Sequence, residues 1–238
     1  MRRILATSVG VLVALALALP VAATQPLKIT VYGGTGMIGQ RIVHEALERG
    51  DIVTVIVRDP VAQTAHHPHL RVRKGDVLDS KQVAADAAGQ DVIVSAVSFR
   101  KPPDPAAYVR AGQSLIEALR SLGPKAPRLI VVGGAGSLRE ASGKLVIESI
   151  PIAHRGEVNG QKDALDYYRT VKDVSWTYFS PAASISPGIR TGKFRLGGDE
   201  LLSDAHGESR ISAEDYAVAV LDEAEKPAHV HQRFTIGY

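Results

Sequence analysis

Three glycines spaced three residues apart stand in the segment VYGGTGMIGQRIV, residues 31–43, where the main chain could come close to a phosphate group. Gly33, Gly36 and Gly39 lie between a β-branched run and a segment with the apolar spacing of an amphipathic helix. A turn without side chains lets backbone N–H groups approach an anion, and the helix N-terminus adds unpaired donors and a positive dipole end. The spacing predicts a phosphate-binding turn, provided that a strand precedes it and a helix follows it.

The segments around this turn alternate between two patterns. Short β-branched runs occupy residues 28–33, 51–57, 70–75, 91–97, 128–134 and 174–181, and helix-period segments occupy 37–49, 104–122 and 157–171. This alternation predicts an α/β fold with a doubly wound parallel sheet, covered by helices on both faces. The turn then follows a strand and opens a helix, as a dinucleotide site requires.

The last part of the chain predicts a small cap beside the main sheet. Residues 184–212 are rich in Gly and Ser and predict loops with short strands. A helix is expected over 212–226, where Ser212 and Asp215 have the spacing of a capping box, and a final strand over 233–237. We therefore expect one domain over residues 28–238, with a small C-terminal cap on the substrate side.

Residues 1–23 predict a signal peptide, with Arg2 and Arg3 before an apolar run and a small-residue cleavage pattern ending at Ala23. The alternative is an uncleaved membrane anchor, because the uncharged stretch is long enough to span a bilayer. We expect an exported or periplasmic protein, or else a membrane-anchored one. The full chain has 28 Lys and Arg residues and 25 Asp and Glu residues. Without Arg2 and Arg3, the rest of the chain has a net charge of only +1. No nucleic-acid partner is therefore expected.

The chain has no cysteine, which excludes thiol catalysis, thiolate metal sites and disulfides. The histidines at 66, 67 and 69 have no acidic residue beside them, so we expect a solvated loop and no metal site.

Six short motifs lie at or near the carboxyl ends of the six predicted strands. They are GGTGMIG at 33–39, VRDP at 57–60, GDVLD at 75–79, SAVS at 95–98, VVGGAGS at 131–137 and WTYFSPAA at 176–183. From residue 28 to 238 the chain resembles the atypical short-chain dehydrogenases/reductases grouped with biliverdin reductase B and NAD(P)H-flavin reductases, which are similar to NmrA-like proteins. The resemblance implies a Rossmann fold that binds NAD(P).

The resemblance also implies which residues bind the cofactor. The pyrophosphate would be held by the first motif, the adenine flanked by the third, and the ribose and nicotinamide lined by the end of the fourth strand. The implied set is Gly33, Thr35, Gly36, Met37 and Ile38, then Asp76 and Val77, then Ala96 and Val97, with Gly133 and Pro181 from the last two motifs.

Arg58, directly after the second strand, bears on the choice between NADP and NAD. A guanidinium can bind a 2′-phosphate in a bidentate way, whereas an NAD site places an acid there to accept bonds from the ribose hydroxyls. NADP is therefore favoured. NAD stays possible, because Asp59 could take the hydroxyl-binding role.

The usual catalytic acid of short-chain dehydrogenases is missing. Tyr168 and Lys172 have the Tyr-x-x-x-Lys spacing, but they fall at the far end of their helix, with Lys172 about 15 Å beyond Lys162 at about 1.5 Å per residue. The family lysine corresponds to Lys162, the tyrosine position holds Val158, and the serine position falls in the Gly-Gly pair at 133–134.

Three residues are left as catalytic candidates: Lys162, and Ser137 and His154 as proton donors in loops near the ligand edge. The alternative for the two loop residues is that each only hydrogen-bonds its own loop. Without the tyrosine, an epimerase or dehydratase is disfavoured. Hydride transfer to a small conjugated acceptor such as a flavin is favoured, because such an acceptor spreads the incoming charge and takes its proton from water. The alternative is a non-catalytic, redox-sensing NAD(P)-binding module of the NmrA type.

Overall fold

The computed structural model describes residues 25–60, 66–100 and 103–238. The expected segment 1–23 lies outside the described residues. Within the described part of the chain, no helix combines the length and the apolar character needed to cross a membrane.

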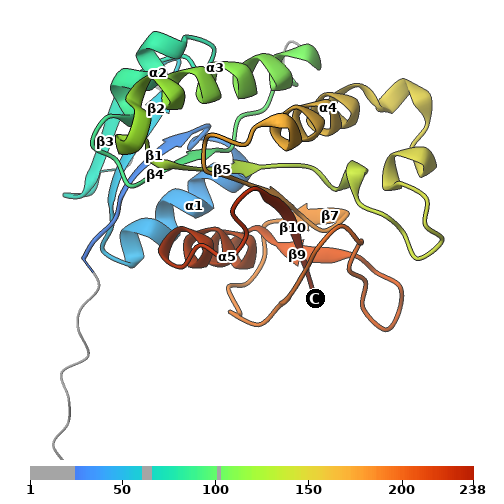
Figure 1. Ribbon diagram of the computed structural model, residues 1–238. Helices are drawn as coiled ribbons and strands as arrows, with labels where there is room; N and C mark the ends of the chain where they lie inside the picture. The colour runs from blue at the N-terminus through green and yellow to red at the C-terminus, as the bar shows by residue number, and fades with distance from the viewer. Residues whose placement is uncertain (1–24, 61–65, 101–102) are drawn as a thin grey trace, which may run out of the picture.

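An eight-stranded sheet forms the centre of the molecule, with strand order β3-β2-β1-β4-β5-β6-β10-β8 (Figure 1). All neighbours pair in parallel except β8, which is antiparallel to β10. The strands are β1 (Lys28–Tyr32), β2 (Ile52–Val57), β3 (Leu70–Lys74), β4 (Val92–Ser95), β5 (Arg128–Val132), β6 (Trp176–Ser180), β8 (Arg195–Gly197) and β10 (Gln232–Gly237). This order confirms the doubly wound arrangement, because the chain reverses its direction of winding between β1 and β4.

Among the described residues, five α-helices cover the two faces of the sheet (Figure 1). α1 and α5 pack together on one face, and α2, α3 and α4 pack in a row on the other. Their bounds are α1 (Met37–Glu48), α2 (Ser80–Ala87), α3 (Ala106–Leu122), α4 (Gly156–Thr170) and α5 (Ala213–Glu225). Short 3-10 turns occupy Gly123–Lys125, Ala135–Ser137, Val146–Ser149 and Ile152–His154.

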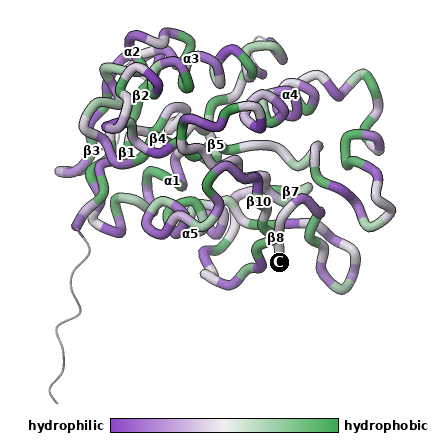
Figure 2. Tube along the Cα trace, in the orientation of Figure 1, coloured by the Kyte–Doolittle hydropathy of each residue, from purple (hydrophilic) through white to green (hydrophobic). Residues whose placement is uncertain are grey.

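The buried side chains form one cluster on each face of the sheet. Successive strand residues point to opposite faces, so in β5 Leu129 packs toward α3 and α4 while Ile130 packs toward α1 and α5. β2, β4 and β5 consist mostly of aliphatic residues, and in Figure 2 the helices alternate between hydrophobic and hydrophilic residues. Burial on both faces explains why these three strands read as nearly continuous apolar runs.

The helix α2, which lies between β3 and β4, is not predicted from the sequence. Asp79 caps its N-terminus by accepting hydrogen bonds from the backbone N–H groups of Lys81 and Gln82, both at 3.1 Å. With eight residues, of which three are buried, the helix has too short an apolar pattern to be recognised by its period.

The C-terminal cap contains a two-stranded sheet of β7 (Ser184–Ser186) and β9 (Arg210–Ser212). Ser212 caps α5 by accepting a hydrogen bond from the backbone N–H of Asp215 at 3.0 Å. The reciprocal half of the expected capping box is absent from the bonds of the described residues, because the Asp215 carboxylate turns toward the backbone of Thr191 and Gly192 instead.

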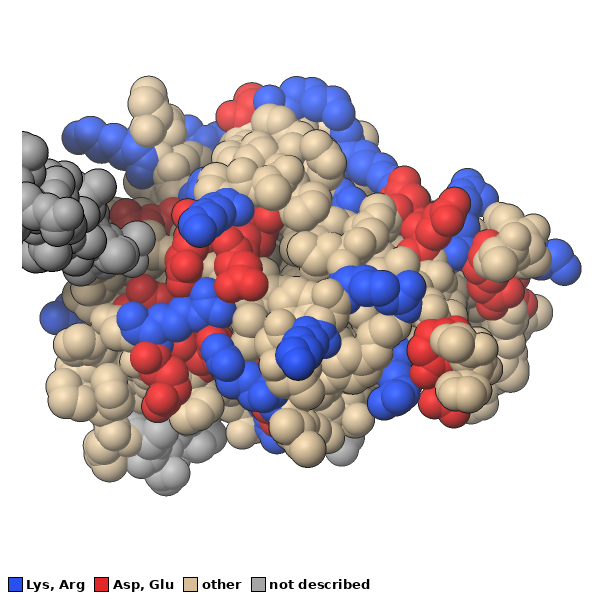
Figure 3. Space-filling view, turned by 90° about the horizontal axis from the view of Figure 1, so that it is seen from below, with Lys and Arg blue, Asp and Glu red and all other residues tan. Residues whose placement is uncertain are grey.

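Ion pairs join α1 and α5, which pack together on the face of the sheet that is lower in Figure 1. Arg49 at the end of α1 pairs with Glu45, with Asp222 at 2.9 Å and with Glu225 at 2.8 Å, and Arg41 pairs with Glu214 at 3.1 Å. Seen from below, acidic and basic side chains are interspersed and neither sign dominates (Figure 3).

Candidate functional site

In the turn between β1 and α1, the structure explains the glycine at each of the positions 33, 36 and 39 in a different way. Gly33 has φ +77°, and a Cβ on it would lie 2.3 Å from the carbonyl oxygen of Ala96. A Cβ on Gly39 would lie 2.1 Å from the carbonyl oxygen of Gly33. Gly36 is exposed, and the nearest atom to a Cβ there would be the Gly33 oxygen at 3.2 Å. Two of these glycines thus allow close packing, and Gly36 leaves open space in front of the helix.

The N-terminus of α1 is suited to binding an anion. Its N-cap residue, Gly36, provides no side chain for a capping hydrogen bond, and the first turn contains no acidic residue. The first N–H groups of a helix have no intrahelical acceptor, so here they are left for a ligand.

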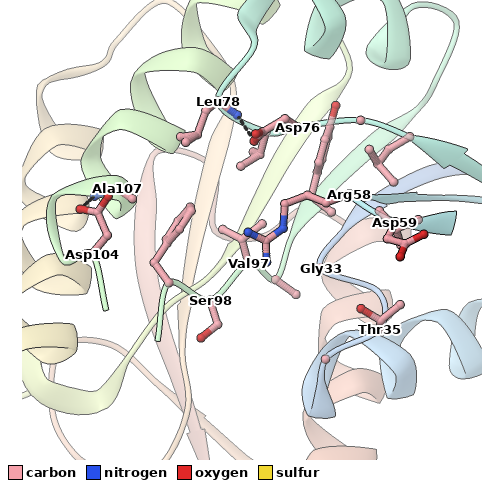
Figure 4. A pocket seen from close by; sticks show the side chains of 18 residues that line it. Gly33, Thr35, Arg58, Asp59, Asp76, Leu78, Val97, Ser98, Asp104 and Ala107 are labelled. Atoms are coloured by element: carbon pink, nitrogen blue, oxygen red, sulfur yellow. Dashed lines mark hydrogen bonds between the residues drawn. The ribbon is translucent and has the colours of Figure 1, made fainter. Parts of the chain in front are cut away.

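A cavity of about 510 Å³ opens beside this turn, at the carboxyl ends of β1, β2, β3 and β4 (Figure 4). It lies at the reversal of strand order, where open parallel sheets bind their ligands. Eight residues of the predicted cofactor-binding set line it: Gly33, Thr35, Gly36, Arg58, Asp76, Val77, Ala96 and Val97. The structure thus brings these eight residues together around one cavity, and their contact with a cofactor stays a prediction.

Arg58 provides the positive charge of the cavity. Its side chain extends from the end of β2 into the cavity, whereas the Asp59 carboxylate points the opposite way (Figure 4). Arg58 has no ion pair with the part of the chain that the structure describes. Asp76 is held in its loop, since its carboxylate accepts a hydrogen bond from the Leu78 N–H at 3.0 Å.

Four residues of the predicted set are not among those that line this cavity: Met37, Ile38, Gly133 and Pro181. Ile38 packs against the core below the sheet. Gly133 lies against Tyr178, whose ring a Cβ would approach to 2.0 Å. Pro181 is buried directly after β6. Contact between these residues and a cofactor stays a prediction.

The loop after β5 packs directly on the first turns of α4. A Cβ on Gly134 would lie 2.0 Å from Gln161 Oε1, and one on Gly136 would lie 1.9 Å from Val158 Cγ1. The loop therefore has no room for a larger residue at Gly136, whereas at Gly134 the end of the Gln161 side chain would have to move. Val158, at the position where the resemblance expects a tyrosine, packs against Gly136, and neither Val158 nor the Gly-Gly pair at 133–134 carries a hydroxyl group.

The three catalytic candidates are spread over α4 and its preceding loops, and none lines the cavity. Lys162 Nζ lies 2.7 Å from the Asp166 carboxylate, and this hydrogen bond raises the pKa of the lysine. Ser137 ends a 3-10 turn, and His154 is exposed in another. The structure does not bring these side chains together.

Tyr168 lies in the last turn of α4, fully buried against Trp176 and Tyr178. Burial raises the pKa of this phenol far above its ordinary value. Lys172 comes after the helix has ended at Thr170. Tyr168 is thus part of the core, and Lys172 follows the C-terminus of α4. Both lie at the opposite end of this helix from the turn that leads into it.

A polar network at the margin of the cavity was not expected from the sequence. Tyr108 on α3 donates to the Glu157 carboxylate at 2.7 Å and accepts from the Phe99 N–H at 3.2 Å, and Arg100 pairs with the same carboxylate. Burial raises the pKa of Tyr108 to about 12, helped by Glu157. The network ties the loop after β4 to the N-terminus of α4. Tyr108 and Glu157 are 49 residues apart in the sequence, so no local motif predicts their contact.

A family described as NAD(P)H-binding matches residues 33–227, a range that starts at the glycine turn and ends after α5. The chain belongs to this NAD(P)H-binding family. The uncapped α1 N-terminus, the open space at Gly36 and the Arg58 cation fit such a cofactor, whose phosphates are anionic.

Three solved structures are similar over nearly the whole NAD(P)H-binding chain. A candidate exported protein from Burkholderia pseudomallei is 41% identical with a TM-score of 0.78, covering 89% of this chain and 100% of its own. A candidate epimerase from Bacteroides thetaiotaomicron is 36% identical with a TM-score of 0.81, covering 90% and 98%. A candidate NADH-flavin reductase from Streptococcus pneumoniae is 29% identical with a TM-score of 0.78, covering 89% and 99%.

Proposed function

We propose that the protein is an NADPH-dependent reductase that transfers a hydride to a small conjugated acceptor, such as a flavin. The observation that carries the proposal is the cavity in front of the uncapped α1 N-terminus, into which Arg58 extends. Membership of the NAD(P)H-binding family and similarity to the candidate NADH-flavin reductase support it.

In this proposal the chain binds and orients the cofactor, which supplies the hydride. The backbone at Gly36 and the first turn of α1 hold the pyrophosphate, and Arg58 meets the 2′-phosphate. Asp76 and Val77, which line the cavity after β3, would flank the adenine, as the resemblance implies. Ala96, which lines the cavity directly after β4, would lie on the ribose and nicotinamide side.

The absence of hydroxyl groups at Gly134 and Val158 favours an acceptor that needs no protein acid. A ring system that delocalises the added electron pair takes its proton from water. A plain carbonyl substrate requires a positioned donor, which here is left to Ser137 or His154. Replacing either by Ala should leave turnover of a flavin acceptor largely unchanged if water is the donor.

Steady-state oxidation of NADPH with FMN or riboflavin as acceptor tests the proposal. We expect saturable turnover, retained in Tyr168→Phe because that hydroxyl is buried at the far end of α4. Binding of NADPH without turnover of any flavin would contradict the reductase and favour a redox-sensing module. Loss of turnover in a folded Tyr168→Phe protein would contradict the location of the chemistry.

We further propose that residues 1–23 direct export, supported by the similarity to a candidate exported protein. Export would separate the enzyme from the cytoplasmic supply of NADPH, so the cofactor would have to be bound beforehand. The mass of the protein recovered from cell fractions tests this proposal. A full-length chain in the membrane fraction would contradict cleavage and indicate an anchor.

A further inference from the structure

We propose that a second cavity, beside β7 and β9, binds a small amphipathic anion: an organic carboxylate or sulfonate with an apolar body. The cavity measures about 570 Å³, close to the cofactor cavity in size, and shares no lining residue with it. This volume is within the range of small-molecule sites, which are mostly apolar with a few convergent polar groups. The proposal does not depend on the proposed reductase activity.

Apolar groups form most of the walls. Pro187, Ile189, Ile211 and the ring of Tyr238 all line the cavity. Ile189 is 77% exposed, so its apolar side chain is open to a ligand. An apolar ligand body of about ten heavy atoms would cover it, and the area removed from water would stabilise the complex.

The charged groups of the lining are both cations, Lys193 and Arg210. Lys193 is exposed and has no ion pair within the described ranges of the chain. Arg210 stacks over Tyr238, with its guanidinium carbon 5.5 Å from the ring centroid, and shares its charge with Glu208 at 3.3 Å. The Asp215 carboxylate lies behind this wall and accepts from the Thr191 and Tyr238 hydroxyl groups, but it is buried. Lys193 is therefore the charged group that a ligand can reach without displacing an ion pair, and the ligand that complements it is an anion.

The wall that carries Ile189 and Lys193 is held in place before any ligand binds. Asp215 accepts hydrogen bonds from the backbone N–H groups of Thr191 and Gly192, both at 2.8 Å. Between them and Ile189, Arg190 makes a bidentate pair with the buried Glu45 at 2.7 and 2.8 Å. A preformed wall lowers the entropic cost of binding, so a ligand of modest size can bind measurably.

Calorimetric titration with naphthalene-2-sulfonate tests the site, with the neutral naphthalene-2-sulfonamide as its matched control. We expect one sulfonate per chain, bound about tenfold more tightly than the sulfonamide, a ratio that corresponds to about 1.4 kcal/mol. Lys193→Gln should weaken the sulfonate about tenfold and leave the sulfonamide unchanged. Ile189→Ser should weaken both probes, because it removes apolar wall that they share.

Two further variants locate the binding. Lys125→Gln removes an exposed lysine elsewhere and should change nothing, and Arg58→Ala should leave sulfonate binding unchanged because it alters only the cofactor cavity. Absence of saturable binding, or an affinity that Lys193→Gln leaves intact, would overturn the proposal. One probe per two chains would also overturn it and indicate that a second copy covers the cavity.

Discussion

Gly36 is less constrained by the protein itself than Gly33 and Gly39 are, because a Cβ there would make one tight contact and no outright clash. Its φ of −74° is open to any residue, and a Cβ would meet only the Gly33 carbonyl oxygen at 3.2 Å. Gly39, in contrast, faces the same oxygen at 2.1 Å. The missing side chain at Gly36 therefore makes sense as space for a ligand, whereas that at Gly39 serves the packing of α1 on the turn.

We expect Gly36→Val to abolish dinucleotide binding while the fold is largely kept. Its side chain would fill the space where the pyrophosphate approaches the helix N-terminus. Thermal unfolding with and without NADPH measures both effects: the wild type gains stability from the ligand by mass action, and the variant gains none. Gly39→Val is the contrasting variant and should destabilise the protein without ligand. A Gly36→Val protein stabilised as much as the wild type would mean that the cofactor binds elsewhere.

We expect Arg58→Ala to weaken NADPH selectively, since the guanidinium extends into the cavity and has no ion pair in the described chain. Loss of a charge-assisted contact should cost about 1.5 to 3 kcal/mol for NADPH and little for NADH, which has no 2′-phosphate. Calorimetric titration of both cofactors into both proteins gives the difference. Equal affinities of the wild type for NADPH and NADH would disprove the assignment.

The loop at 187–193 is fastened to α5 chiefly by one buried carboxylate. Asp215 has no exposed surface and accepts from the Thr191 and Gly192 backbone, from the Thr191 hydroxyl at 2.6 Å and from the Tyr238 phenol at 2.8 Å. Burial alone would raise the pKa of this carboxyl, but the hydrogen bonds outweigh burial and hold the pKa below its ordinary value. The ionised form is therefore the one that stabilises the fold.

We expect Asp215→Asn to lower the free energy of unfolding by about 3 kcal/mol at pH 7. Because the folded pKa is lower than the unfolded value of about 3.9, the stabilisation is present above pH 4 and is lost as pH falls through the folded pKa. The gap between variant and wild type should narrow below pH 4 in denaturant titrations. Asp163→Asn, on the exposed surface of α4, should change little at any pH. A gap that stays constant with pH would contradict this assignment.

The sequence predicted well the elements whose signal is local. Continuous β-branched runs such as that of β2 mark strands buried on both faces, and Gly-x-x-Gly spacing marks the turn beside them. Pairings of distant segments had no such signal: β7 lies beside β9 through a register that joins Ser184 to Arg210. The contact between Tyr108 and Glu157 likewise exists only because α3 and α4 pack together. The residues that line the cavity at the glycine turn could therefore be predicted from the sequence, whereas the contacts between distant segments at its margin could not.

The first and last helices of the domain lie side by side beneath the sheet, and this closes the molecule into one unit (Figure 1). β10 inserts next to β6, and its Phe234 stacks on Phe179 with ring centroids 3.9 Å apart. Phe179 in turn stacks on Tyr216 of α5 at 4.3 Å. The same buried cluster includes Val31 and Ile42, on either side of the cofactor turn. The C-terminal elements and the cofactor turn therefore share a core.

If that core is continuous, the C-terminal elements cannot unfold on their own. We expect the domain to unfold in a single calorimetric transition, and Phe234→Ala to lower its stability by about 3 to 5 kcal/mol through the cavity left beside Phe179. For a domain of this size the midpoint should fall by about 2 to 4 °C for each kcal/mol, and NADPH should still raise it in the variant. Leu196→Ala, at a half-exposed position on β8, is the control and should shift the midpoint by less than about 2 °C. Two separate transitions in Phe234→Ala, of which only one responds to NADPH, would mean that the cap is an independent unit.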